Sequence, residues 1–194
     1  MIDATLKSLG LDRSLSGNLS LFVDLFGKWN RSINLSAAST RDEIIEHLVD
    51  SLHVIPHLRG AARVLDVGSG GGFPVAVAAI CLPDVAFTSL EPVHKKHAFL
   101  RTAARELALP NLDPHAQRIE DHETHDYDVA MSRATFDLVE WIQTGLRYVN
   151  DHGIVLGFEA IPRDDLPPGT ERHSYALAGK QRAIVVARRA PADS

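Results

Sequence analysis

The sequence predicts an α/β fold: a doubly wound, mostly parallel sheet that ends in an antiparallel hairpin and follows a small N-terminal helical extension. Three observations predict it. Short apolar runs alternate with helical patterns from residue 62 onward, one run turns directly into a glycine-rich loop, and the last two runs are separated by Gly179-Lys180. Strands that alternate with helices form parallel sheets, whereas two runs joined by a short glycine turn pair as a hairpin.

The first part of the chain is predicted to be helical. Apolar residues recur at helical spacing, with an imperfect fit, over residues 15–26 and again over residues 44–54. Thr40 or Asp42 could cap the second helix, because a short polar residue before an apolar periodic stretch is typical of a helix start.

The rest of the chain is predicted to alternate strands and helices. Strands are expected at residues 63–67, 85–90, 114–119 (a weak pattern), 128–132 and 153–158, and in a hairpin of residues 173–177 and 182–187. Helices are expected at residues 75–82, 93–107 and 136–149, the first of them with Pro74 in its first turn.

Length and composition suit one globular unit of ordinary size with a small extension. The chain has 194 residues, of which 45% are hydrophobic and 23% are charged, so it can bury a full core. We place the helical extension at residues 1–60 and the α/β domain at residues 61–194. The formal net charge of −5 argues against a protein that coats nucleic acid through bulk charge, although it leaves room for a local basic face.

The sequence contains no recognisable membrane segment or targeting signal. It has no run of about 18 apolar residues, and its N-terminus lacks the basic start and apolar run of a signal peptide. We therefore expect a cytoplasmic protein that does not enter a membrane, and we expect it to be a monomer without a metal site.

The glycine-rich loop is the first candidate for chemistry. Asp66-Val67-Gly68-Ser69-Gly70-Gly71-Gly72-Phe73 joins a predicted strand to a predicted helix. This arrangement puts backbone N–H groups and the positive end of a helix at the carboxyl edge of the sheet, where α/β proteins bind ligands. Phe73 stands where a dinucleotide-binding loop needs a third glycine. S-adenosylmethionine (SAM) has no phosphate and tolerates a bulkier residue there, so the loop favours SAM over NAD.

Two further segments point to a nucleoside ligand. Glu91 ends the second predicted strand, at the distance beyond the loop where an acid can accept hydrogen bonds from both ribose hydroxyls. After the third predicted strand, Ile119 offers an apolar edge and Glu120 an acid for the adenine amine. By itself Glu91 could be an ordinary solvated glutamate, but together with Asp66 and the glycines it favours an adenosyl group.

These motifs, with others, resemble a known family. Trp29-Asn30, Asn34-Leu35-Ser36, His47-Leu48-Val49-Asp50-Ser51, the glycine loop with Pro74, residues 95–101 and Ser132-Arg133-Ala134 occur in the order seen in the glucose-inhibited division protein B family. Members are bacterial methyltransferases that methylate guanine N7 in 16S ribosomal RNA of the small subunit. The resemblance spans residues 22–187, and it implies a Rossmann-like, SAM-dependent methyltransferase.

The resemblance also implies roles for individual residues. The cofactor would contact Asp66, Gly68, Gly70, Phe73, Glu91, Ile119, Glu120 and Arg133, and the substrate side would hold Asn34, His47, Asp50 and Ser51. His47 could equally be a helix histidine bonded to a nearby carbonyl, and Asp50-Ser51 could be no more than a polar helix face.

Guanine N7 needs no general base, because its in-plane lone pair can attack the methyl group without losing a proton. Catalysis then comes mainly from aligning N7, the methyl group and sulfur. A donor near O6 would stabilise the charge that builds on the purine. Arg133 is the candidate catalytic residue, since a planar guanidinium can bond a guanine edge in two places.

A local basic face is predicted on the helix after Glu91. Lys95, Lys96 and Arg101 lie there with two histidines and a further arginine. A solvated amphipathic helix would look similar, but with the family resemblance we expect this face to contact RNA phosphates of 16S ribosomal RNA or of the small subunit.

Two positions depart from the family. Glu46 stands where a basic residue is common, and Glu159-Ala160 stands where the family usually has Lys-Gly, so each change replaces a positive charge by a negative one. The alternatives are a SAM methyltransferase that acts on another RNA or a small molecule, and a nucleoside-binding protein without catalysis. An NAD-dependent enzyme ranks last, because of Phe73.

Overall fold

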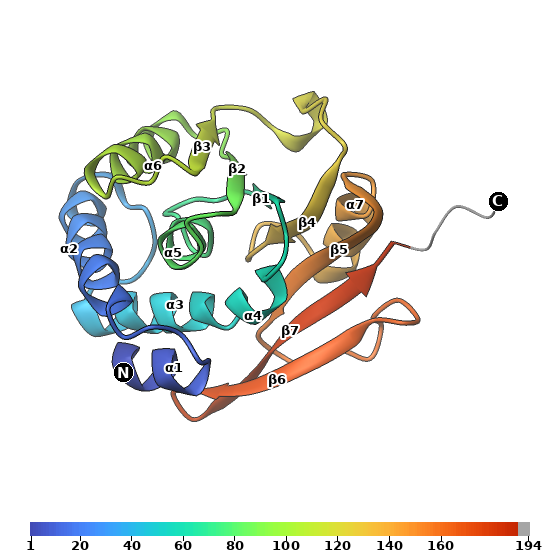
Figure 1. Cartoon of the computed structure of the whole chain (residues 1–194), viewed down its shortest axis with the longest axis horizontal. Helices are drawn as coiled ribbons and strands as arrows, with labels where there is room; N and C mark the ends of the chain where they lie inside the picture. The colour runs from blue at the N-terminus through green and yellow to red at the C-terminus, as the bar shows by residue number, and fades with distance from the viewer. Residues whose placement is uncertain (190–194) are drawn as a thin grey trace.

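Seven strands form one sheet in the order β3-β2-β1-β4-β5-β7-β6, within residues 1–189, the part of the chain that this computed structural model describes (Figure 1). The strands are β1 (Arg63–Val67), β2 (Ala86–Leu90), β3 (Leu112–His115), β4 (Tyr127–Ser132), β5 (Val149–Glu159), β6 (Glu171–Leu177) and β7 (Lys180–Arg188). β1 to β5 pair in parallel, and β7 pairs antiparallel with both β5 and β6. The predicted fold class is confirmed.

Helices cover both faces of the sheet. They are α1 (Ile2–Ser8), α2 (Leu15–Ile33), α3 (Arg41–Leu52), α4 (Ile55–Leu58), α5 (Val75–Cys81), α6 (His94–Glu106) and α7 (Leu138–Gly145), with a 3-10 turn, η1, at Ile119–Asp121. Alternate residues of β1 face opposite sides: Val64 packs with α2, α3, α5 and α6, whereas Leu65 and Val67 pack with α7.

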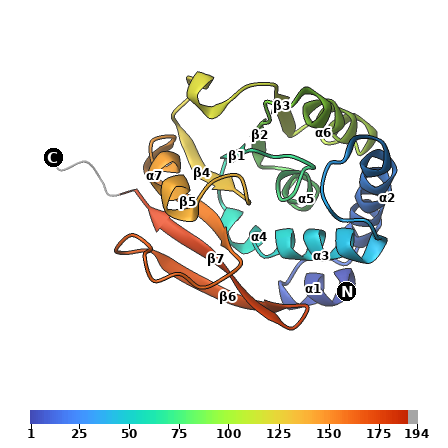
Figure 2. The same ribbon diagram turned by 180° about the vertical axis from the view of Figure 1, so that it is seen from behind.

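The N-terminal helices share one hydrophobic core with α5 and α6. Phe22 and Phe26 of α2 pack against Phe73 at 5.1 and 5.0 Å between ring centroids, and both also contact Phe99 of α6. Seen from behind, the loop that joins α2 to α3 passes beside α5 (Figure 2). The carboxyl edge of the sheet is therefore bordered by this loop as well as by the loops that follow the strands.

Local signals placed most boundaries well. Thr40, and not Asp42, caps α3 in a capping box: its hydroxyl accepts from the Glu43 backbone, and the Glu43 carboxylate accepts from the Thr40 backbone. The hairpin turn is made by Ala178 and Gly179 and not by Gly179-Lys180, because Lys180 already pairs with Leu177. Both turn residues have positive φ (50° and 74°), as a two-residue hairpin loop with the twist of its strands requires.

Several predicted boundaries were wrong, including the start of β5, which is at Val149 and not at residue 153. The third strand is Leu112–His115 and not residues 114–119, because Ile119 begins the turn η1. The helix predicted at residues 136–149 covers only Leu138–Gly145, and Val149 already belongs to β5. Asp137 stops the helix from starting earlier, since its carboxylate accepts from the Val139 and Glu140 backbones as an N-cap.

Pro74 is the N-cap residue of α5 and lies just before the first turn in which the sequence placed it. Within residues 1–189, no helix combines the length and the apolar character needed to cross a membrane.

Candidate active site

Glu91 ties the glycine loop to the start of α6. Its carboxylate is buried, with 4% of the residue exposed, and its Oε2 accepts a hydrogen bond of 2.8 Å from the Gly70 backbone. Its Oε1 accepts one of 2.8 Å from the Val93 backbone. Each oxygen keeps a second lone pair, so the acid can still accept from two hydroxyl groups. Glu91 thus lies against the loop, where the sequence placed a ribose contact.

The glycines of the loop are needed for different reasons. Gly68 has φ of +71°, and a Cβ there would lie 2.2 Å from the Thr135 hydroxyl; a Cβ on Gly71 would lie 2.3 Å from the Phe26 ring. Gly70 also has positive φ (+53°), but a Cβ there would have only the Gly68 carbonyl within 4 Å, at 3.8 Å. Close packing therefore requires Gly68 and Gly71, whereas Gly70 borders open space that a ligand can enter.

Asp66, the residue before the last of β1, has a buried side-chain oxygen without a hydrogen-bond partner in the part of the chain that the structure describes. Its Oδ2 is unpaired among the described residues, and only 1% of the residue is exposed. Burial raises the pKa of its carboxyl group from 3.8 to about 7. A buried acceptor without a partner is unusual in a folded protein, and it suits the amino group of a cationic ligand.

A hydrogen-bonded turn lies beyond β3, where the adenine contact was predicted. Ile119 is buried, and its carbonyl accepts a 2.8 Å hydrogen bond from the Tyr148 hydroxyl. Three residues on, His122 joins the Tyr127 hydroxyl at 2.8 Å and Gln117 at 2.7 Å through its two ring nitrogens. These bonds fix η1 from behind, while the side chain of Glu120 is exposed.

Arg133 follows β4, next to the glycine loop that follows the neighbouring strand β1. Its Nη1 lies 3.3 Å from Asp50 Oδ2 and 3.4 Å from His47 Nδ1, both on α3. The guanidinium also lies over the Phe73 ring, 5.4 Å from its centroid. Phe73 therefore separates the cofactor loop from an arginine and a histidine, in a hydrophobic setting that strengthens polar contacts.

Asp50 is the centre of this cluster. The residue is 3% exposed, and its Oδ1 accepts from the Tyr175 hydroxyl at 2.7 Å and from Arg182 at 3.3 Å. Tyr175 and Arg182 are cross-strand partners in the hairpin, so both side chains reach α3 from one face. The Asp50 carboxylate holds Arg133 and Arg182 near each other. The two positive charges can lie this close because the carboxylate offsets part of their repulsion.

His47 is held in its neutral form. Burial lowers the pKa of its imidazole, and the adjacent Arg133 charge lowers it further. At neutral pH the ring can accept or donate one hydrogen bond without adding a charge. Its ring centroid lies 5.9 Å from that of Phe73, so it borders the same hydrophobic partition.

Some predicted site residues lie elsewhere. Ser51 is fully buried, and its hydroxyl donates to the His47 carbonyl at 2.8 Å, so it supports the helix and does not face a substrate. Asn34 is exposed at the C-terminal end of α2, in left-handed conformation (φ 54°). On α6, Lys95 and Lys96 lie in the first turn, and Arg101 is exposed nearly two turns further along.

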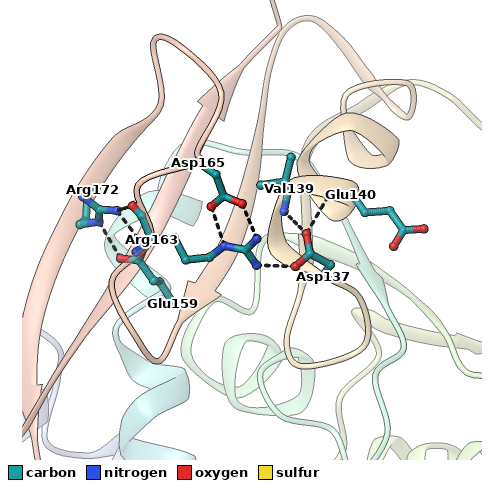
Figure 3. A network of polar contacts seen from close by, with 7 residues as sticks. All are labelled: Asp137, Val139, Glu140, Glu159, Arg163, Asp165 and Arg172. Carbon is teal, nitrogen blue, oxygen red and sulfur yellow. Dashed lines mark hydrogen bonds and ion pairs between the residues drawn. The ribbon is translucent and has the colours of Figure 1, made fainter.

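The structure changes the meaning of Glu159. It is buried, with 4% of the residue exposed, and both carboxylate oxygens accept from Arg172, at 2.6 and 2.8 Å (Figure 3). Its Oε1 also accepts from the Arg163 backbone at 2.9 Å. The negative charge by which the chain departs from the family is therefore paired with Arg172 inside the fold.

A second part of the same network ties the loop after β5 to α7. The Arg163 guanidinium donates to Asp165 and to Asp137, the residue that caps α7 (Figure 3). Asp137 lies four positions after Arg133, in the loop that follows β4. The Arg163–Asp137 ion pair therefore links the loops after β4 and β5. By contrast, Glu46 is only partly buried and borders a small cavity beside His47 and Arg182.

Three residues that bond to the predicted site residues were not predicted from the sequence: Tyr148, Tyr175 and Arg182. A signal existed for the last two. The glycine turn fixes the hairpin register, which makes Tyr175 and Arg182 neighbours, but the register does not say which element they face. Tyr148 carried no signal, because it lies in a turn of irregular structure just before β5.

The sequence has known relatives. The family model described as rRNA small subunit methyltransferase G (GidB) matches residues 16–186. A ribosomal RNA small subunit methyltransferase G of Neisseria meningitidis serogroup B is 37% identical over 167 residues, which cover 84% of this chain and 81% of the relative. One from an Azoarcus species is 34% identical over 197 residues, covering 94% and 93%.

Solved structures with the same fold are methyltransferases of low sequence identity. The O-methyltransferase TomG of Streptomyces achromogenes, solved in complex with SAM, has a TM-score of 0.62 at 16% identity and covers 97% of this chain and 96% of its own. The tRNA (m1A58) methyltransferase TrmI of Aquifex aeolicus has a TM-score of 0.59 at 14% identity, with 74% and 69% covered. At this identity the likeness shows the fold alone.

Proposed function

The chain belongs to the GidB family of small-subunit ribosomal RNA methyltransferases, and from that premise we propose that it transfers a methyl group from SAM to N7 of a guanine in 16S ribosomal RNA. The proposal includes the small ribosomal subunit as partner, a monomeric enzyme and a cytoplasmic location. The observation that carries the proposal is the position of Arg133. Asp50 holds its guanidinium over the ring of Phe73, the last residue of the cofactor loop.

The chain's residues suit SAM. Glu91 would accept the ribose hydroxyls, the open space at Gly70 would admit the ligand to the loop, and the unpaired Asp66 oxygen suits the cofactor's amino group. Ile119 would contact the adenine ring through its apolar edge, and Glu120 would reach the adenine amine from the same turn. When bound, SAM supplies a methyl group on a positively charged sulfur.

The protein's part in the reaction is positioning and electrostatics. The attacking N7 lone pair loses no proton, so no side chain has to act as a base, which agrees with a neutral His47. Arg133 would donate to the guanine O6 edge and stabilise the charge that develops on the purine. Phe73 and the packed α2 helix shield one side of the cofactor loop from water, which strengthens these contacts.

One labelling experiment tests this function. The protein would be incubated with methyl-labelled SAM and, in parallel, with immature small subunits, free 16S ribosomal RNA and a total metabolite extract. We expect label in the RNA, at a guanine where treatment with borohydride and aniline cleaves the RNA chain. That cleavage is the reaction of N7-methylguanine. Label in another RNA or only in small molecules would overturn the ribosomal substrate, and no transfer despite SAM binding would support a nucleoside-binding protein.

A second candidate has one observation in its favour. Glu46 lies at the cavity beside His47 and Arg182, where a negative charge opposes an RNA phosphate. A methyltransferase acting on a small cationic molecule would fit that charge. The metabolite arm of the labelling experiment separates this candidate from the first.

A further inference from the structure

A large groove lies beside the candidate site and has no role in the function proposed above. It has a volume of about 930 Å3 and lies between the C-terminal half of α2, the loop to α3, the first turns of α3 and the first turn of α6. Its walls include Asn30, Arg31, Asn34, Arg41, Ile44 and Lys96. We call it the outer groove. Its size is within the range of cavities that hold a nucleotide-sized ligand.

The outer groove lies at the same edge of the sheet as the reaction site. Lys96 lies in the first turn of α6, which starts just after the carboxyl end of β2. On the opposite wall, α3 carries Ile44 into the groove and, one turn later, His47 towards Arg133. A second cavity of about 260 Å3, lined by His47 and Arg182, shares Ala37 and Ala38 with the outer groove. Ala37 and Ala38 therefore border both cavities, so the outer groove lies next to the cavity beside His47.

The rim of the outer groove is fixed in place by side-chain bonds. Asn30 donates through its amide to the Ala38 carbonyl at 2.6 Å and accepts from the Ser36 backbone at 2.9 Å. Asn34 closes α2 in left-handed conformation, with its backbone N–H bonded to the Asn30 carbonyl at 3.1 Å. A strand entering the groove would therefore meet a preformed surface, which reduces the entropy lost on binding.

The charges of the outer groove favour a polyanion. Arg41 forms an ion pair with Asp24, which also lines the groove, so these two charges cancel. Arg31 and Lys96 form no ion pair with any residue in the described part of the chain. They project from α2 and α6, on two different walls, so the groove has a net positive charge. A guanidinium and an ammonium are the groups that bind phosphate oxygens most readily.

We propose that the outer groove binds the phosphate backbone of the RNA strand that flanks the target guanine, with Arg31 and Lys96 each contacting a phosphate. This deepens the proposed function and rests on it, because the strand is that of the RNA substrate. An acidic protein segment is the competing occupant. RNA is favoured because the outer groove has a net positive charge and adjoins the cavity beside His47, where a strand that flanks the target guanine can reach it.

Charge reversal at matched positions tests the proposal. The variants are Arg31→Glu, Lys96→Glu and their double, with Lys28→Glu as control: Lys28 lies exposed on the same helix as Arg31 but does not line the groove. Affinity for a 16S ribosomal RNA fragment would be measured by fluorescence anisotropy over a series of salt concentrations, and affinity for SAM by calorimetry. Circular dichroism would show that each variant is folded.

We expect each groove variant to bind RNA roughly five- to ten-fold more weakly than the control. Each should reduce the slope of log affinity against log salt by about 0.7, the value for one lost phosphate contact on a single strand, and SAM affinity should stay unchanged. Groove variants that bind RNA with the affinity and salt slope of Lys28→Glu would overturn the groove proposal. It would also be overturned if the groove variants kept their affinity for RNA but lost affinity for an acidic peptide measured in the same way. If the wild type itself neither binds nor methylates 16S ribosomal RNA, the proposed function fails first, which is a different result.

Discussion

Arg133 Nη1 lies 3.3 Å from Asp50 Oδ2, although the two residues are 83 positions apart in the sequence. The contact joins the loop after β4 to helix α3, and the same carboxylate holds Tyr175 and Arg182 from the hairpin. Three separate elements therefore meet at one buried charge beside the cofactor loop. Each element can be tested through the residue that it contributes.

Replacing Arg133 should greatly slow methyl transfer and spare the fold. In Arg133→Ala, Asp50 keeps its bonds to Tyr175 and Arg182, so the buried carboxylate stays paired and thermal unfolding should change little. Loss of a donor aimed at developing charge typically lowers kcat by about 100- to 1,000-fold. Single-turnover methylation of 16S ribosomal RNA measures this; wild-type turnover would show that Arg133 has no catalytic role.

Replacing Asp50 should damage both stability and activity. Asp50→Ala leaves Arg133 and Arg182, with side chains 17% and 27% exposed, without their shared counter-ion. Removing one partner of a buried ion pair costs about 3 kcal/mol or more, and partial exposure brings the expected loss to about 2 kcal/mol. Urea unfolding gives the stability, and the kcat measured well below the unfolding transition should still fall because Arg133 is no longer positioned.

Stability without SAM should fall as pH rises towards neutrality. Burial raises the pKa of Asp66 from 3.8 to about 7, so the folded state binds one proton more than the unfolded state between these two values. The stability that this proton contributes is fully present below about pH 4 and is lost as pH rises through about 7. The loss is up to about 4 kcal/mol, since each pKa unit is worth about 1.4 kcal/mol.

Asp66→Asn isolates that contribution. The difference in unfolding free energy between wild type and Asp66→Asn should shift in favour of the variant as pH rises from 4 to 8. SAM should bind the wild type more tightly at pH 8 than at pH 6, because the ionised carboxylate suits its amino group. Parallel stability curves for the two proteins at all pH values would contradict the assignment.

The hydroxyls of Tyr148 and Tyr175 should separate cofactor binding from substrate turnover. Tyr148→Phe removes one of the two donors to the Ile119 carbonyl, which keeps only the His122 backbone N–H, and loosens η1, so affinity for SAM should fall about five- to ten-fold in calorimetry. Tyr175→Phe removes a hydroxyl from Asp50 and should leave SAM affinity unchanged while it lowers kcat on RNA. Each variant is the control for the other, and equal effects of both on SAM affinity would argue for a general loss of structure.

Arg172 should matter for stability far more than other surface arginines of the hairpin. Arg172→Ala leaves buried Glu159 unpaired and should lower the free energy of unfolding by about 2 kcal/mol. Arg188→Ala breaks an exposed pair with Glu171 and should cost less than about 0.5 kcal/mol. Adding Glu159→Gln to Arg172→Ala should restore most of the loss; no recovery would mean that Arg172 stabilises the hairpin by packing alone.

Much of the fold follows from local patterns in the sequence. Alternating apolar runs and helical periods fixed the order of strands and helices, and Gly179 fixed the hairpin, because each signal acts within a few residues. The boundaries of β3 and α7 were less predictable. Asp137 accepts from the backbone of α7 and sets its start, and a single capping residue outweighs the apolar pattern around it.

The cofactor side of the site was also readable from the sequence. Parallel strands end at one edge of a sheet, so the loop at Gly70 and the acid at Glu91 had to lie close together, and their hydrogen bond of 2.8 Å shows that they do. By itself, the sequence determined the architecture, the loop and the acid that faces it.

The tertiary structure alone decided which distant charges meet. Asp50 contacts Arg133, Tyr175 and Arg182. Glu159 forms an ion pair with Arg172, whereas from the sequence it was only a negative charge where the family usually has a positive one. Periodicity records which face of an element is buried, but it carries no information on which side chain of a remote element will be opposite. That depends on sheet register and helix packing, which the whole chain determines together.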